Sequence, residues 1–175
     1  EQELARRVSS SVPFFALDTL SNYNSPGQLV ISGEREALER AMALAKARGA
    51  RRVIPLTVSI AGHSRLMRPA AEKFAEAMAR EEFHQAHIPL VANTCARPVQ
   101  SIAEIKEGLV AQFTSPVRWV QSIRYMIQLG VGTFIELGPG NVLSGLIRRI
   151  DDQVITIAVG DVASLERLLA NLKEK

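Results

Sequence analysis

A histidine stands where a hydrophobic, β-branched segment gives way to a helix-like one. His63 lies between Gly62 and Ser64, and residues 52–60 before it read as a strand. In open α/β sheets, ligands bind and chemistry occurs at the carboxyl ends of the strands. Imidazole is also the usual general base for a serine or cysteine nucleophile. His63 is therefore the first candidate for a catalytic group, against the simpler interpretation of an inert loop histidine.

Ser64 is a candidate nucleophile beside this histidine. The run Gly62-His63-Ser64-Arg65-Leu66 begins like a Gly-x-Ser-x-Gly elbow between a strand and a helix. Leu66 replaces the closing glycine, and the later histidines, His84 and His87, lie within or just after the next helix. The order Ser, acid, His is therefore not completed. A serine hydrolase built on Ser64 remains an alternative that the pattern disfavours.

Two other groups of residues have weaker claims to a site. Glu81 and Glu82 precede His84 and His87, but no third ligand is placed beside them, so we expect no metal site. The run Gly138-Pro139-Gly140 before a helix has amides that can hold a phosphate, although a structural turn is the simpler interpretation.

Composition is typical of a soluble globular protein of one domain or two small subdomains. The chain has 175 residues, of which 47% are hydrophobic and 22% charged. Its net charge of +3 is spread along the sequence, so we expect no nucleic-acid partner. No apolar run reaches the roughly 18 residues of a membrane helix, so we expect no membrane partner. The single cysteine, Cys95, fits a cytoplasmic location, and we expect its thiol to be at least half-buried.

The order of expected elements indicates an α/β fold whose first part is incomplete. Apolar spacing and turn residues predict a helix, two strands of a hairpin with a loop of moderate length at Ser25-Pro26-Gly27, a helix and a strand. These cover residues 1–12, 14–24, 28–32, 34–47 and 52–60. One strand placed in front would complete a βαββαβ unit. We therefore expect residues 1–60 to form a ferredoxin-like small subdomain that lacks its first strand.

The rest of the chain alternates helices with short strands. Helices are expected over residues 65–80, 101–113, 116–130, 141–150 and 162–172, and strands over residues 88–92, 133–137 and 154–158. Ser101 and Glu104 have the spacing of a capping box, and the strand at 88–92 reads as buried. Strands separated by helices favour a parallel sheet with helices on both faces. Residues 61–175 are thus expected to form part of a larger α/β subdomain.

Four blocks of this sequence resemble, in order, those of the malonyl-CoA:acyl carrier protein transacylase family. They are residues 22–33, 54–67, 112–119 and 136–143, within a stretch from 22 to 150. The resemblance implies an α/β-hydrolase-like parallel sheet, of which this chain holds a part, beside the ferredoxin-like subdomain. Acyltransferase domains of polyketide synthases share this core and are an alternative.

The resemblance also implies a reaction and roles for particular residues. Family members transfer a malonyl group from coenzyme A to the phosphopantetheine thiol of acyl carrier protein in fatty acid synthesis, through an acyl-serine and without a cofactor. His63 matches the base, and Gln112 matches the glutamine whose backbone carbonyl orients the imidazole. Asn24, Gly62 and Ser64 are expected to bind substrate. Gly62 stands where many malonyl-selective members carry phenylalanine, so exclusion of an α-methyl group is not implied.

The nucleophilic serine of the family, and the arginine that pairs with the malonyl carboxylate, lie upstream of these blocks. We therefore expect this chain to be the C-terminal half of such an enzyme, inactive and poorly folded without its upstream half. Besides that half, the expected partners are a coenzyme A thioester and acyl carrier protein, the latter through a basic surface. The alternative is a non-catalytic fragment that binds acyl carrier protein or coenzyme A. The basic surface expected to attract acyl carrier protein consists of the arginines Arg51, Arg52, Arg65, Arg68, Arg118 and Arg124.

Overall fold

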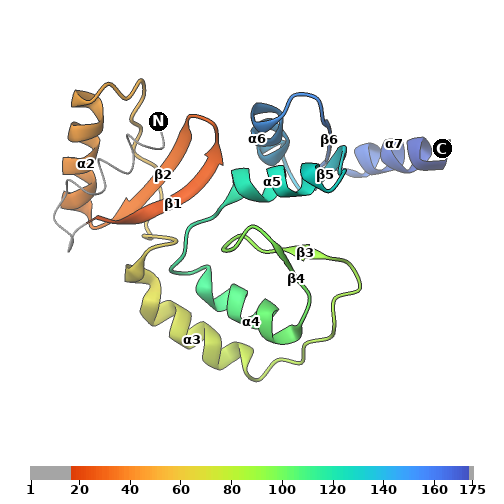
Figure 1. Ribbon diagram of the computed structural model, residues 1–175, viewed down its shortest axis with the longest axis horizontal. Helices are drawn as coiled ribbons and strands as arrows, with labels where there is room; N and C mark the ends of the chain where they lie inside the picture. The colour runs from red at the N-terminus through yellow and green to blue at the C-terminus, as the bar shows by residue number, and fades with distance from the viewer. Residues whose placement is uncertain (1–16, 174–175) are drawn as a thin grey trace. The chain divides into compact units, whose positions relative to one another are not determined.

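The computed structural model describes residues 17–173, so the helix expected over residues 1–12 lies outside the described residues. The chain divides into two compact units, Glu1–Ser122 and Ile123–Lys175. Figure 1 shows the elements of both units along the chain. The boundary between subdomains that the sequence places at residue 60 stays a prediction.

The first unit opens with an antiparallel hairpin. Strands β1 (Leu17–Ser25) and β2 (Gln28–Gly33) pair so that Ser25 lies opposite Gln28. The loop is therefore only Pro26 and Gly27, shorter than expected. Gly27 has φ +80°, the positive value that a type II turn needs after proline.

Helix α2 (Arg35–Ala47) covers this hairpin, as Figure 1 shows, and confirms the helix expected there. Ala37 and Ala41 on its inner face are fully buried, and Ile31 of β2 packs against them. Two alanines let the helix backbone approach the sheet closely. Gly49 follows the helix with φ +88°, which a residue with a Cβ rarely adopts.

The strand expected over residues 52–60 is wrong within the described residues. This segment forms no β-ladder, although its apolar side chains recur at every second position. Those side chains are 58–67% exposed and belong to Ile54, Leu56, Val58 and Ile60. A strand needs a neighbour to hydrogen-bond with, and none of the described strands pairs with this segment.

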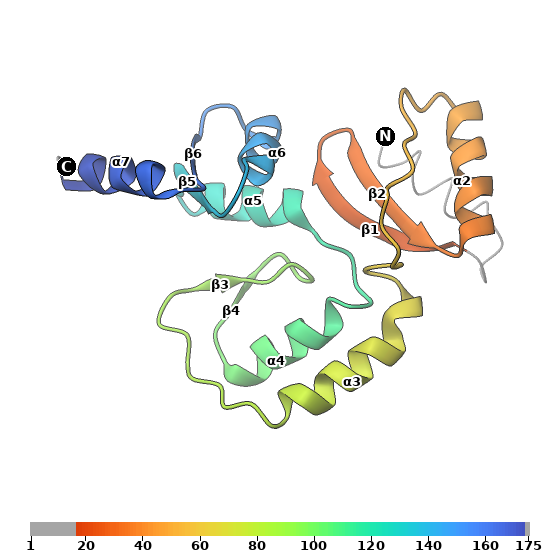
Figure 2. The same cartoon turned by 180° about the vertical axis from the view of Figure 1, so that it is seen from behind.

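A turn and two helices follow. The single helix expected over residues 65–80 is a 3₁₀ turn, η1 (Arg65–Met67), followed by α3 (Arg68–Met78). Pro69 lies in the first turn of α3, where its missing N–H costs nothing. Figure 2 shows α3 alongside α4 (Ile102–Ala111).

The start of α4 confirms the expected capping box. The Ser101 hydroxyl accepts a hydrogen bond from the N–H of Glu104, and the Glu104 carboxylate accepts one from the N–H of Ser101, both at 3.2 Å. These bonds satisfy two backbone donors that a helix start otherwise leaves unpaired. Bonds from the Ser101 N–H, the Gln100 N–H and the Ser101 hydroxyl hold the pKa of Glu104 below its usual value.

A short hairpin precedes α4. Strands β3 (Leu90–Val91) and β4 (Pro98–Val99) pair antiparallel. A strand is thus present within residues 88–92, but the expectation that it is buried is wrong, because Ile88 is 80% exposed. Cys95 in the connecting turn is exposed, so the expectation that its thiol is at least half-buried is wrong.

Helix α5 (Trp119–Gln128) begins three residues later than expected. Val117, which the sequence places inside that helix, instead pairs with β1. Its N–H donates to the Ser21 carbonyl at 2.8 Å, and its carbonyl accepts from the N–H of Tyr23 at 2.9 Å. Because the backbone at Val117 is held in this bridge to β1, the helix begins only at Trp119.

The second unit contains a β-α-β crossover. Strands β5 (Thr133–Leu137) and β6 (Ile155–Val159) are parallel and are joined through α6 (Val142–Ile150), and α7 (Val162–Lys173) follows β6. Parallel neighbours require such a crossover connection. The mixed α/β fold with a parallel segment is confirmed. The ferredoxin-like and hydrolase-like subdomains, and helices on both faces, stay predictions. No helix of the described residues is long and apolar enough to cross a membrane.

Candidate active site

His63 occupies a strained turn between residues 52–60 and η1. Its φ is +61°, in the left-handed region that residues with a Cβ seldom adopt. Such a conformation costs about 1–3 kcal/mol and persists only where surrounding contacts hold it. The side chain is half-buried. The turn therefore holds the imidazole in one direction at a cost that other interactions must offset.

The His63 ring is hydrogen-bonded to a backbone carbonyl 49 residues away. Its Nδ1 lies 2.7 Å from the carbonyl oxygen of Gln112. A carbonyl oxygen can only accept, so Nδ1 must carry the hydrogen. In the neutral ring, the lone pair is then on Nε2, which is the tautomer that a base acting through Nε2 needs.

Helix α4 explains why this carbonyl is available. Gln112 is the C-cap residue of α4, and the last carbonyls of a helix have no partner within it. The N–H groups of Phe113 and Thr114 turn back to the carbonyls of Val110 and Ala111. The Gln112 carbonyl instead bonds His63, at the helix end that carries partial negative charge.

An aromatic contact ties the two sides of this hydrogen bond together. Phe74 on α3 and Phe113, which follows Gln112, have ring centroids 5.0 Å apart and planes inclined by 38°. Helix α3 begins just after the His63 turn, so this contact joins the element after His63 to the residue after Gln112. The sequence analysis did not identify this pair. Its only signal was two phenylalanines on neighbouring expected helices.

Ser64 is fully buried and both functions of its hydroxyl are engaged. The hydroxyl donates to the Ala61 carbonyl at 2.7 Å and accepts from the N–H of Leu66 at 3.2 Å. Its proton is thus directed to a carbonyl. This arrangement disfavours Ser64 as a nucleophile. A contact between Ser64 and substrate stays a prediction.

Gly62 and Asn24 are the other expected substrate-binding residues. A Cβ added at Gly62 would meet only Cδ1 of Ile60, at 4.0 Å, which is an ordinary van der Waals contact. Gly62 therefore leaves the position before the histidine without a side chain, although a Cβ fits there. Asn24 is half-buried near the end of β1. The structure brings His63 and Gln112 together, and the roles of Asn24 and Gly62 stay predictions.

The phosphate site considered at Gly138-Pro139-Gly140 is disfavoured. The carboxylate of Glu136 accepts hydrogen bonds from the N–H of Leu143 at 3.0 Å and of Ser144 at 2.7 Å, at the start of α6. Hydrogen bonds from Ser144 and Leu143 hold the pKa of Glu136 below its usual value. The Glu136 carboxylate therefore already accepts the hydrogen bonds that the amides of Leu143 and Ser144 would offer a phosphate. Gly138 and Gly140 have positive φ, as expected for a structural turn.

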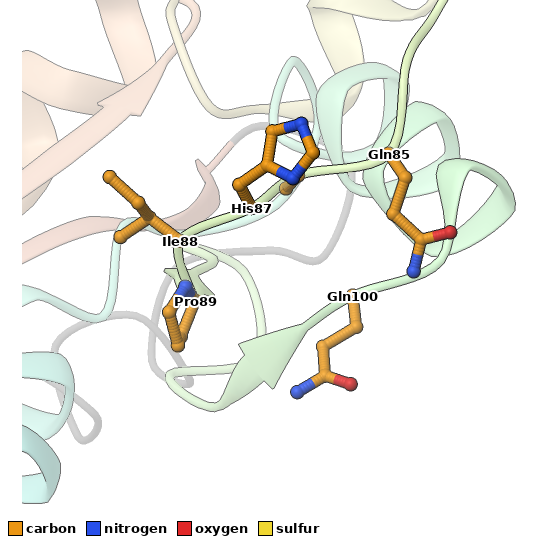
Figure 3. A pocket seen from close by; sticks show the side chains of 6 residues that line it. Gln85, His87, Ile88, Pro89 and Gln100 are labelled. Atoms are coloured by element: carbon orange, nitrogen blue, oxygen red, sulfur yellow. The ribbon is translucent and has the colours of Figure 1, made fainter.

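The histidines after α3 lie apart from this arrangement. His84 is 4.0 Å from the carboxylate of Glu82, and both side chains are more than 80% exposed. Figure 3 shows His87 beside Gln85 and Gln100, around a surface hollow that residues 85–89 and Gln100 line. Within the described residues, no three His, Cys, Asp or Glu side chains are grouped as metal ligands.

Comparisons with known proteins match most of this chain. The acyl transferase domain family matches residues 17–168. A malonyl CoA-acyl carrier protein transacylase of Bacillus subtilis is 47% identical over 156 residues, which are 89% of this chain and 49% of that protein. The chain thus spans about half the length of the curated relatives it matches.

Solved structures of malonyl transacylases also resemble this chain. An acyl carrier protein S-malonyltransferase from Vibrio cholerae has a TM-score of 0.92 and 40% identity, covering 96% of this chain and 55% of that one. A malonyl-transacylase in complex with a type II PKS acyl-carrier protein has a TM-score of 0.92 and 42% identity, covering 97% and 55%. The chain belongs to the acyl transferase domain family, and its resemblance to the malonyl-CoA:acyl carrier protein transacylases is confirmed.

Proposed function

We propose that this chain is part of a malonyl-CoA:acyl carrier protein transacylase of fatty acid synthesis and supplies its general base. The observation that carries the proposal is the hydrogen bond between Nδ1 of His63 and the Gln112 carbonyl. It leaves Nε2 as the basic nitrogen of the neutral ring. The proposal places the nucleophilic serine outside these 175 residues and the reaction in the cytoplasm.

In the first half-reaction, His63 activates the serine. Nε2 takes the hydroxyl proton while the serine oxygen bonds to the carbonyl carbon of malonyl-CoA. The tetrahedral intermediate then collapses and its carbon–sulfur bond breaks. The coenzyme A thiolate leaves with the proton from the imidazolium. The products are malonyl-serine and free coenzyme A.

The second half-reaction runs through the same groups. The phosphopantetheine thiol of acyl carrier protein gives its proton to Nε2, and its sulfur attacks the acyl-serine. The serine oxygen leaves and regains the proton from His63. Atoms and charges balance with the serine, one base and two thiols, so the proposal requires no cofactor.

Gln112 takes the place of the carboxylate in a Ser-His-Asp triad. Its carbonyl holds the Nδ1–H and, through its partial negative charge, stabilises the positive charge that the imidazole gains during transfer. Because the accepting atom belongs to the backbone, the role does not depend on the glutamine side chain. Gln112 is therefore proposed as the residue that orients the base.

Two further features bear on substrate and partner. The lack of a side chain at Gly62 supports a site that admits an α-substituted malonyl group. Several arginines of the first unit are exposed, and an acidic carrier protein would be attracted to a basic surface formed from them. They include Arg51, Arg52, Arg65, Arg68 and Arg118. Arg68→Glu is expected to slow transfer to the carrier protein while leaving acyl-serine formation unchanged. An unchanged rate of transfer would show that Arg68 does not contribute to recognition of the carrier protein.

The test is the mass of the full-length protein after incubation with malonyl-CoA, measured intact and then on its proteolytic peptides. We expect the added mass of one malonyl group on a peptide outside residues 1–175, and its loss when phosphopantetheinylated carrier protein is added. A label on the Ser64 peptide would instead support a nucleophile at Ser64. Binding of carrier protein without any label would support a non-catalytic binding protein.

A further inference from the structure

We propose that Ser64 is a positioning residue, which holds His63 in its left-handed turn so that Nδ1 meets the Gln112 carbonyl. The relevance of this role to transfer rests on the proposed function above. The role itself rests on the hydrogen bonds around one strained residue.

The Ser64 hydroxyl closes a ring over the two residues before it. Its oxygen lies 2.7 Å from the Ala61 carbonyl, so the bond spans Gly62 and His63. The same oxygen accepts the N–H of Leu66 at 3.2 Å, and the backbone carbonyl of Ser64 accepts the N–H of Met67 at 3.0 Å. One buried side chain thus joins the residue that enters the turn to the 3₁₀ turn that leaves it.

The strain in this turn is at the residue that the ring encloses. His63 has φ +61°, whereas Ser64 has an extended backbone with φ −126°. A left-handed histidine relaxes toward negative φ unless its surroundings prevent it. Such a relaxation rotates the direction in which the side chain leaves the backbone. The distance of 2.7 Å between Nδ1 and the Gln112 carbonyl leaves little room for that rotation.

The burial of Ser64 makes its hydroxyl difficult to replace. The residue is completely inaccessible, so water cannot take over the bond to the Ala61 carbonyl while the turn keeps its shape. Loss of the hydroxyl leaves a carbonyl and an N–H that regain partners only if the turn changes. The sequence made Ser64 a disfavoured candidate nucleophile, because the run from Gly62 begins like a Gly-x-Ser-x-Gly elbow but lacks the closing glycine. The geometry assigns the same hydroxyl to shaping that turn.

The experiment compares Ser64→Ala with Ser122→Ala in the full-length protein. Ser122 is a matched control, because it is also buried and its hydroxyl also donates to a backbone carbonyl, that of Arg118 at 3.1 Å. The first readout is the ¹⁵N and ¹H NMR signature of the His63 ring, which reports the Nδ1–H tautomer and its hydrogen bond without any transfer activity. The second is the split of kcat and KM for malonyl transfer.

We expect Ser64→Ala to lose the signature of a hydrogen-bonded Nδ1–H, and to lower kcat on the order of ten- to a hundredfold with KM little changed. Ser122→Ala should keep the signature of the hydrogen-bonded Nδ1–H and the kcat of the unaltered protein. If Ser64→Ala does not fold, Ser64→Cys gives the same comparison, because a thiol is a weak donor and acceptor. Ser64→Thr, which restores the hydroxyl, should restore the ring signature.

The outcomes separate this inference from the proposed function. A ring signature that depends on Ser64 in a protein without malonyl transfer would support the positioning role and overturn the function. Malonyl transfer with an unaltered ring signature and unaltered kcat in Ser64→Ala would overturn the positioning role and leave the function standing.

Discussion

The contact between Phe74 and Phe113 should couple the helix that follows His63 to the end of the helix that carries Gln112. Truncating a fully buried phenylalanine to alanine costs about 3–5 kcal/mol. Both rings are only half-buried, so we expect each single variant to lose about 2 kcal/mol of unfolding free energy. Their inclined rings, 5.0 Å apart, have a favourable aromatic geometry, which predicts a coupling energy of about 0.5–1.5 kcal/mol.

The assay is a double-mutant cycle on the full-length protein, measured by urea unfolding with circular dichroism. The matched control pairs Phe74→Ala with Phe83→Ala. Phe83 contacts the Lys106 ammonium instead, 4.5 Å from its ring centroid. That second cycle should be additive within about 0.5 kcal/mol. A coupling between Phe74 and Phe113 no larger than that of the control pair would refute the reasoning that this ring contact joins α3 to α4.

Three further predictions concern the site and the helix that supports it. Gln112→Ala should change malonyl transfer little, because the backbone carbonyl remains; a loss as large as that of a His63 variant would contradict this. Gly62→Phe should lower the ratio of methylmalonyl to malonyl transfer by placing a side chain at the position before His63, and an unchanged ratio of the two kcat/KM values would contradict it. The lowered pKa of Glu104 means that its stabilising contribution is present above the usual value of 4.5 and is lost as pH falls through the lower folded value. Glu104→Gln should therefore flatten the acid limb of a pH–stability curve, and an unchanged acid limb would show that this carboxylate does not contribute.

The sequence predicted the elements whose signals are local. Ser101 and Glu104 carry their capping pattern within four residues, and the structure confirms it. The helix 34–47 was likewise readable from its apolar spacing and the glycine after it. Such elements are set by propensity and by contacts between near neighbours along the chain.

The predictions that failed depend on partners distant in the sequence. Residues 52–60 have the alternation of a strand but no described neighbour to pair with. Pro116 has the character of a helix start, yet Val117 pairs with β1 across almost a hundred residues. Periodicity reports which face of a segment is apolar, not what lies against it.

Much of the site depends on backbone atoms, which the sequence does not display. The family resemblance suggested the Gln112 carbonyl, but only the end of α4 explains why that carbonyl is available to His63. The sequence also identified Ser64, as a disfavoured nucleophile and an expected substrate-binding residue, but did not show what its hydroxyl bonds. Its hydroxyl could be assigned only when its partners at Ala61 and Leu66 were known.

The most direct test of the central claim is the rate of malonyl transfer to acyl carrier protein by the full-length protein with His63→Ala. The control is His87→Ala, an exposed histidine outside the proposed site. Removal of a general base predicts a fall in kcat of about 10²–10⁴-fold for His63→Ala and no change for the control. A His63→Ala variant that transfers malonyl at the rate of the unaltered protein would contradict the account.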